Sequence, residues 1–212
     1  MRKLETFALI SFLAVCTAAT AADGRVVVKF LSRERAGWQD QVSPFAAKRF
    51  AYLDKSREKG LEEAMRGAST EDLTLIHSVL DGETVAASPD RLVGNWRCRT
   101  IKLGGMTPDV IYGWFRCRIS LKDGAPYFEK LSGSQRTSGF LYPEGGGFVY
   151  LGASYVTGEK PHAYSGNGAT AGAPATPDDQ IGLLSLLPDG RARLELPFPV
   201  QESTFDVLEL KR

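Results

Sequence analysis

The feature that most constrains the fold is a near-repeat of an aromatic residue followed by Arg-Cys-Arg. One copy spans residues 94–101 and the other spans residues 113–119, and turn-forming residues (GGMTPD, 104–109) lie between them. This arrangement is typical of two antiparallel strands joined by a loop. We therefore predict a hairpin in which Cys98 faces Cys117, because that register centres the connection between Thr107 and Pro108.

Side-chain alternation assigns the residues of this hairpin to two faces. Trp96, Cys98 and Cys117 share one face, which we expect to be buried. The other face carries four arginines, namely Arg97, Arg99, Arg116 and Arg118. Like charges directly opposite one another are destabilising, so acidic groups of this chain or of a partner should lie near them.

Residues 1–21 are typical of a secretory signal peptide. Arg2 and Lys3 precede an apolar run over residues 7–15 that is too short to span a bilayer, and Ala-Thr-Ala at 19–21 fits a cleavage site. A lipid anchor on Cys16 is the alternative, although the valine before it is larger than the residue usual there. We expect a periplasmic or secreted protein, and no later stretch predicts a transmembrane helix.

Export also determines how the cysteines are interpreted. Cleavage removes Cys16 and leaves Cys98 and Cys117, and an even pair in an oxidising compartment predicts a disulfide. Two free buried thiols are the alternative. Cleavage also leaves equal numbers of basic and acidic residues. This balance argues against a general nucleic-acid binder, which is normally strongly basic.

Residues 22–90 are predicted to form a tether and a helical segment. Ser43-Pro44 is a typical helix start, as is Ser69, and we expect Gly60 to interrupt the first of these two helices. The second should end before Asp81-Gly82, where a linker over residues 81–90 begins.

Residues 91–212 are predicted to form a domain of short strands joined by tight turns. We place eight strands at 93–103, 110–121, 126–131, 134–142, 147–156, 180–187, 191–196 and 204–210. The predicted fold is therefore α+β, with the helical segment followed by an eight-stranded antiparallel up-and-down β-barrel. The segment 157–179 is rich in Gly, Ala, Pro and Ser, and we expect a mobile surface loop there rather than a functional lid.

Gly94-x-Trp96 at the start of an eight-stranded meander resembles the signature of lipocalins and calycins. The resemblance implies that Trp96 packs at the closed end of the barrel and that a basic residue of the last strand, Lys211 or Arg212, lies over it. The helical front half departs from simple lipocalins, and so do the arginines of the first strand.

Longer blocks resemble a second family. WRCRTIKLG (96–104), YGWFRCRI (112–119), FEKLSGSQRTSG (128–139) and STFDVLEL (203–210) are similar to the blocks of an uncharacterised family of exported proteobacterial proteins, a domain of unknown function. This resemblance covers most of the mature chain. It implies no activity.

The residues needed for catalysis or metal binding do not occur in a suitable pattern. A Ser-His-Asp site needs a positioned base, and the only histidines are His77 in a predicted helix and His162 in the predicted loop. Two cysteines and two isolated histidines are too few for a zinc site. Gly145-Gly146-Gly147 lacks the following helix of a phosphate-binding loop. We therefore expect no catalytic, cofactor or metal site.

The arginines are the candidate functional surface, because guanidinium groups bind carboxylate or phosphate in bidentate geometry. The candidate set is Arg97, Arg99, Arg116, Arg118 and Arg136. The bound group would be an acidic protein surface or a small ligand. The alternative, which we favour, is internal pairing with acids such as Glu129, Asp206 and Glu209.

Three functions follow from these features. The first is a non-catalytic binding or scaffold barrel of the cell envelope. The second is a lipocalin-like carrier of a small apolar ligand, which a wide apolar cavity would favour. The third is an inhibitor of an exported hydrolase, by fold-level analogy with disulfide-linked bacterial inhibitor barrels.

Overall fold

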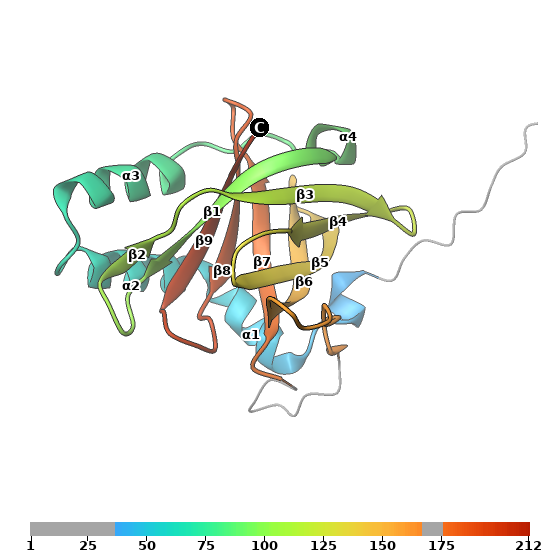
Figure 1. The fold of residues 1–212 in the computed structure, drawn as a ribbon, viewed down its shortest axis with the longest axis horizontal. Helices are drawn as coiled ribbons and strands as arrows, with labels where there is room; N and C mark the ends of the chain where they lie inside the picture. The colour runs from blue at the N-terminus through green and yellow to red at the C-terminus, as the bar shows by residue number, and fades with distance from the viewer. Residues whose placement is uncertain (1–36, 167–175) are drawn as a thin grey trace, which may run out of the picture. The chain divides into compact units, whose positions relative to one another are not determined.

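A closed barrel of eight antiparallel strands forms the body of the protein (Figure 1). The computed structural model describes residues 37–166 and 176–212, so the predicted signal peptide, Cys16 and the tether before residue 37 lie outside the described residues. Eight strands close the barrel, and the short strand β2 is added to its side. The strands are β1 (Gly94–Leu103), β2 (Asp109–Ile111), β3 (Phe115–Lys122), β4 (Ala125–Lys130), β5 (Gln135–Glu144), β6 (Gly147–Val156), β7 (Asp179–Leu186), β8 (Ala192–Pro197) and β9 (Phe205–Lys211).

The connectivity is that of the predicted meander. From β3 to β9 each strand pairs with the next, β3 also pairs with β1, and pairing of β1 with β9 closes the barrel. The short strand β2 adds to β1 beyond the end of β3. The predicted α+β class and the eight-stranded barrel are confirmed.

The predicted second strand is split by a β-bulge. Ile111 of β2 pairs with Ile101, and Phe115 of β3 pairs with Cys98, so residues 112–114 oppose only two residues of β1. The register predicted from the turn was therefore wrong by two residues. Cys117 lies opposite Trp96, and Cys98 lies opposite Phe115. A shift of two residues leaves every side chain of β3 on its predicted face, whereas the pairs of β2 are shifted by three residues.

The helices precede the barrel and cover part of its outer surface. They are the 3₁₀ helix η1 (Trp38–Asp40) and the α-helices α1 (Pro44–Ala51), α2 (Leu53–Ala64), α3 (Thr70–Leu80) and α4 (Pro89–Leu92). Both predicted N-caps are confirmed. Ser43 Oγ accepts a hydrogen bond from the Ala46 amide at 3.1 Å, and Ser69 Oγ accepts one from the Asp72 amide at 3.0 Å.

Gly60 does not interrupt a helix, contrary to the prediction. The break falls at Tyr52, between α1 and α2, and Gly60 lies inside α2. A Cβ atom at Gly60 would lie 2.8 Å from the Cβ of Phe205 and 3.2 Å from that of Leu103. The missing side chain is what lets α2 approach β1 and β9 closely.

The helices and the barrel share buried clusters. Ile76, Val79 and Leu80 of α3 pack with Ile101 and Leu103 of β1, so apolar residues on the outer face of the barrel are covered. All described residues belong to one compact unit, and the boundary expected between residues 90 and 91 falls within α4. None of the helices in the described part of the chain has the length and apolar character to cross a membrane.

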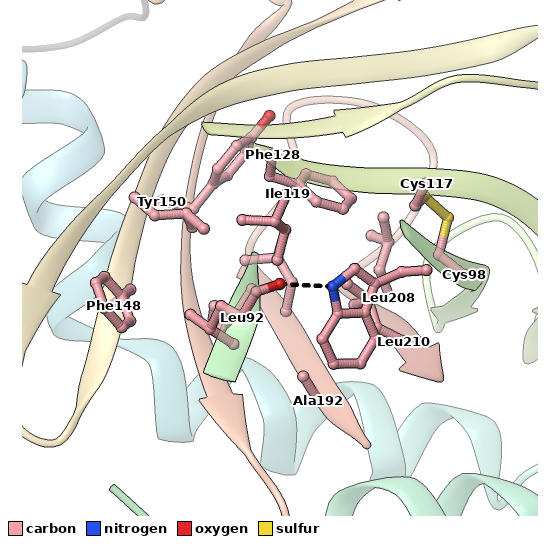
Figure 2. Packing of buried hydrophobic residues seen from close by; sticks show 14 of the residues in the cluster. Leu92, Cys98, Cys117, Ile119, Phe128, Phe148, Tyr150, Ala192, Leu208 and Leu210 are labelled. Atoms are coloured by element: carbon pink, nitrogen blue, oxygen red, sulfur yellow. Dashed lines mark hydrogen bonds between the residues drawn. A yellow bond between two sulfur atoms is a disulfide. The ribbon is translucent and has the colours of Figure 1, made fainter. Parts of the chain in front are cut away.

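The end of the barrel near α4 is filled with apolar side chains (Figure 2). Trp96 is 3% exposed, and its Nε1–H donates a hydrogen bond to the Leu92 carbonyl at 2.7 Å. The Arg212 guanidinium lies 4.7 Å from the centre of the Trp96 ring, which is the kind of contact that the lipocalin resemblance implies. Cys98 and Cys117 form a disulfide in the same cluster, with Cα atoms 5.8 Å apart, and this confirms the predicted pair.

Candidate functional site

A cavity of about 270 Å³ lies at the opposite end of the barrel. It is bordered by the β6–β7 connection and the β8–β9 loop, both at the end away from α4 (Figure 1). The inward-facing side chains change character toward this end. On β4 the inward position after Phe128 is Lys130, and on β9 the inward position before Leu208 is Asp206. The barrel interior is thus apolar at one end and polar at the other.

Lys130 lies at the boundary between the apolar core and the cavity. The residue is 7% exposed, and its Nζ donates a hydrogen bond to the Gln135 carbonyl at 2.7 Å. The same nitrogen lies 4.3 Å from the centre of the Phe115 ring. Burial, and to a smaller extent the nearby positive charges of Lys102 and Arg136, together lower the pKa of Lys130 to about 8.

Lys102 and two acids occupy the β1 and β9 side of the cavity. The Lys102 ammonium forms an ion pair with Glu202, and it lies 3.5 Å from Gln135 Oε1. Asp206 accepts a hydrogen bond from Ser203 Oγ at 2.6 Å. Burial raises the pKa of Asp206 to about 6, although the Ser203 hydrogen bond and the Lys102 charge oppose that rise. On this side of the cavity, Lys102 and the two acids therefore have partners within the chain.

A chain of hydroxyl and amide groups crosses from the core to the cavity. Thr137 Oγ1 lies 2.6 Å from the Tyr150 hydroxyl and 3.1 Å from the Ala153 carbonyl, and it also bonds Gln180 Oε1. Burial raises the pKa of Tyr150 far above its usual value, so the hydroxyl stays protonated. Thr137 and Gln180 both line the cavity and can hydrogen-bond a polar ligand.

Two of the predicted arginines are paired within the chain. Arg99 Nε lies 2.6 Å from Glu209 Oε2, and Arg118 Nη2 lies 2.9 Å from Glu129 Oε2. Both acids were named as internal partners from the sequence. Each of these two arginines therefore already has an acidic partner within the chain.

The other predicted arginines lie in different surroundings. Arg97 and Arg116 are exposed and face each other across β1 and β3. Arg97 lies over the Trp114 ring at 5.8 Å, as do Arg99 at 4.7 Å and Lys211 at 4.1 Å. Arg136 does not join this group on β1 and β3. It lies on β5, donates from Nε to the Gly133 carbonyl at 3.2 Å, and lines the cavity.

Lys130 and Asp206 were not predicted as site residues from the sequence. Both could have been recognised as charged residues at positions of a predicted strand where side-chain alternation predicts an inward-facing apolar residue. Trp114 was also missed, because the bulge beside it was not foreseen.

Each histidine lies near one carboxylate on the surface. His77 Nδ1 lies 2.9 Å from Asp81 on the exposed end of α3, and His162 lies 4.0 Å from Glu159. Within residues 37–166 and 176–212, no three side chains of the His, Cys, Asp and Glu types lie close enough together to hold a metal ion.

Comparison with known proteins identifies a family. A family model described as a domain of unknown function, DUF4893, matches residues 38–210, which is the stretch from η1 to β9. No curated protein and no solved structure matches the chain. Because the matched residues include the helices, the core and the cavity, the chain belongs to the DUF4893 family.

Proposed function

We propose that this protein is a non-catalytic binding barrel of the cell envelope that takes a small polar ligand into the cavity at its open end. The observation that carries the proposal is the contrast between the two ends of the barrel. Trp96 and Leu92 fill one end, whereas the other end is hollow and has the buried ammonium of Lys130 in its lining. A buried charge is costly unless it is paired, so this lining favours a site for ligand binding.

The size and lining of the cavity favour a small and polar ligand. Small-molecule sites have volumes of roughly 300–1,000 Å³, and this cavity, at about 270 Å³, is close to the lower limit. The resemblance to lipocalins favours the same end of the barrel, but with an apolar ligand. The inward-facing Lys102, Lys130 and Asp206 are the reason for preferring a polar one.

The absence of catalysis is part of this proposal. The two groups in the cavity with strongly shifted pKa values, Lys130 and Asp206, hydrogen-bond the Gln135 carbonyl and Ser203, respectively. Their placement is suited to holding a ligand.

Location in the envelope rests on the signal peptide predicted over residues 1–21 and on the Cys98–Cys117 disulfide. Mass spectrometry of the protein from fractionated cells should find a mature chain beginning at Ala22, with these cysteines linked. An unprocessed chain with two free thiols would argue against export.

Filling the cavity tests the binding function. Thr100 lines the cavity, and Thr100→Trp should occupy its space, whereas Thr74→Trp on the exposed surface of α3 is the matched control. Small molecules released on denaturing each natively purified protein would be identified by liquid chromatography and mass spectrometry. We expect a compound that the wild type and Thr74→Trp release and that Thr100→Trp lacks. Release from all three proteins would place binding elsewhere.

A further inference from the structure

We infer that the ligand carries an anionic group, a carboxylate or a phosphate, which binds between Lys130 and Arg136 at the β4–β5 side of the cavity. This inference rests on the proposed function and adds the chemical class of the ligand. It starts from the charges that line the cavity.

Lys130 has no acidic partner. Its single hydrogen bond goes to a main-chain carbonyl, so two of the three ammonium donors remain unused by the described residues. Its charged neighbours, Lys102 and Arg136, are both cations. Lys130 is 7% exposed, and apart from the Phe115 ring its ammonium has only cations as charged neighbours, so it lacks a counter-charge. An anion in the cavity would supply it.

Arg136 offers the second half of the site. Its Nε is used by the Gly133 carbonyl, while its two terminal nitrogens have no hydrogen bond or ion pair to the described residues. The side chain lines the same cavity as Lys130. The unused edge of a guanidinium fits both oxygens of a carboxylate or two oxygens of a phosphate.

The acids that line the cavity do not fill this role. Glu202 pairs with Lys102, and Asp206 accepts from Ser203. The other three lie on or beside the β6–β7 connection and accept from nearby donors. Asp178 accepts from Ser154, Asp179 from Ser165, and Glu159 from the Val156 amide. Glu202 is thus neutralised by Lys102, the other four are held by neutral donors, and none of the five is among the charges that shift the pKa of Lys130.

The rest of the ligand would meet neutral polar groups. Thr137 and Gln180 lie in the same lining and are linked by a hydrogen bond. Hydroxyl and amide groups of this kind can donate to or accept from the body of the ligand. The lining thus fits a small acid that carries further polar groups better than a long aliphatic acid.

The experiment compares charged probes with neutral analogues on the full mature chain. Acetate, succinate and inorganic phosphate are titrated by NMR, with acetamide and succinamide as neutral controls. We expect saturable binding of at least one anion and none of the amides. Binding of carboxylates alone or of phosphate alone would identify which group the site takes.

Variants then locate the site. Lys130→Met and Arg136→Met should each weaken anion binding by roughly 10- to 100-fold, as expected for loss of a charge-assisted hydrogen bond. Lys48→Met on α1 and Arg66→Met after α2 are exposed controls and should leave binding unchanged. Arg136→Met keeps the test valid if Lys130→Met does not fold, because Arg136 lies at the edge of the cavity and is less buried.

The outcomes separate this inference from the proposed function. Equal binding by Lys130→Met, Arg136→Met and the controls would place the anion elsewhere and overturn the inference. A neutral or cationic compound that is released by the wild type and lost in Thr100→Trp would also overturn it, while leaving the cavity as a ligand site. If no probe binds and no compound is released, both proposals fail.

Discussion

Asp206→Asn should stabilise the protein at neutral pH, although an interpretation based on ion pairs predicts the opposite. Asp206 is 7% exposed and lies near the positive charges of Lys102 and Arg49. Its pKa is nevertheless raised to about 6 from 3.8, because the cost of burial exceeds those attractions. Asparagine keeps the shape of the side chain and an oxygen that can accept from Ser203 Oγ.

The size of the effect follows from that pKa. A difference of one pH unit in pKa corresponds to ~1.4 kcal/mol, so ionised Asp206 costs the folded state about 3 kcal/mol. The folded chain holds a proton that the unfolded chain releases near pH 4. The stabilising contribution of the protonated acid is therefore complete below pH 3.8 and is lost as the pH rises through 6. Asp206→Asn should remove this loss.

Urea unfolding at pH 4, 5, 6, 7 and 8 measures the free energy of unfolding of both proteins. We expect a difference below about 1 kcal/mol at pH 4 and a gain for Asp206→Asn of about 3 kcal/mol at pH 7 and above. Glu58→Gln replaces an exposed carboxylate on α2 and should show no such pattern. A variant less stable than the wild type at pH 7 would refute the reasoning and show that the attraction to Lys102 outweighs the cost of burial.

Three further substitutions test the fold and the arginines, each by thermal and urea unfolding. Trp96→Ala should cost about 3–5 kcal/mol, because the ring is buried in the core, and an unchanged melting temperature would contradict its structural role. Arg99→Gln should lower the free energy of unfolding by ~1–3 kcal/mol, because it removes a partner of buried Glu209. Arg116→Gln should leave stability unchanged or raise it, because Arg116 faces Arg97. Equal losses in the two variants would show that both arginines are structural. Gly60→Ala should destabilise by roughly 1–3 kcal/mol despite the better helix propensity of alanine, because its Cβ meets β9, and a gain would show that α2 can move outward.

Much of the barrel could be predicted because its signals are local. Turn residues such as Pro188-Asp189-Gly190 mark the ends of strands, and alternation assigned the arginines and cysteines to their faces. The register of the first hairpin could not be predicted in the same way. It depends on an extra residue at 112–114, and nothing in a turn rule reveals a bulge inside a strand.

The candidate site was harder to predict because it depends on contacts between residues far apart in the sequence. Lys130 and Asp206 face one cavity only because β4 and β9 belong to the same closed barrel. Alternation places each of them on an inward face, but it does not say which end of the barrel is filled. That depends on α4 and Leu92, at the boundary between the linker predicted over residues 81–90 and the strand domain predicted from residue 91, where no helix was predicted.

Closure of the barrel by β1 and β9 has a consequence for the order of folding. The pairs Arg97–Lys211 and Leu103–Phe205 join residues about a hundred positions apart, so they form at a high entropic cost and late. Phe205 and Val207 also belong to the cluster that buries the apolar faces of α2 and α3. Because the chain is synthesised from its N-terminus, these helices form long before the strand that covers them. Their apolar faces stay open to aggregation and to chaperones until the last strand arrives.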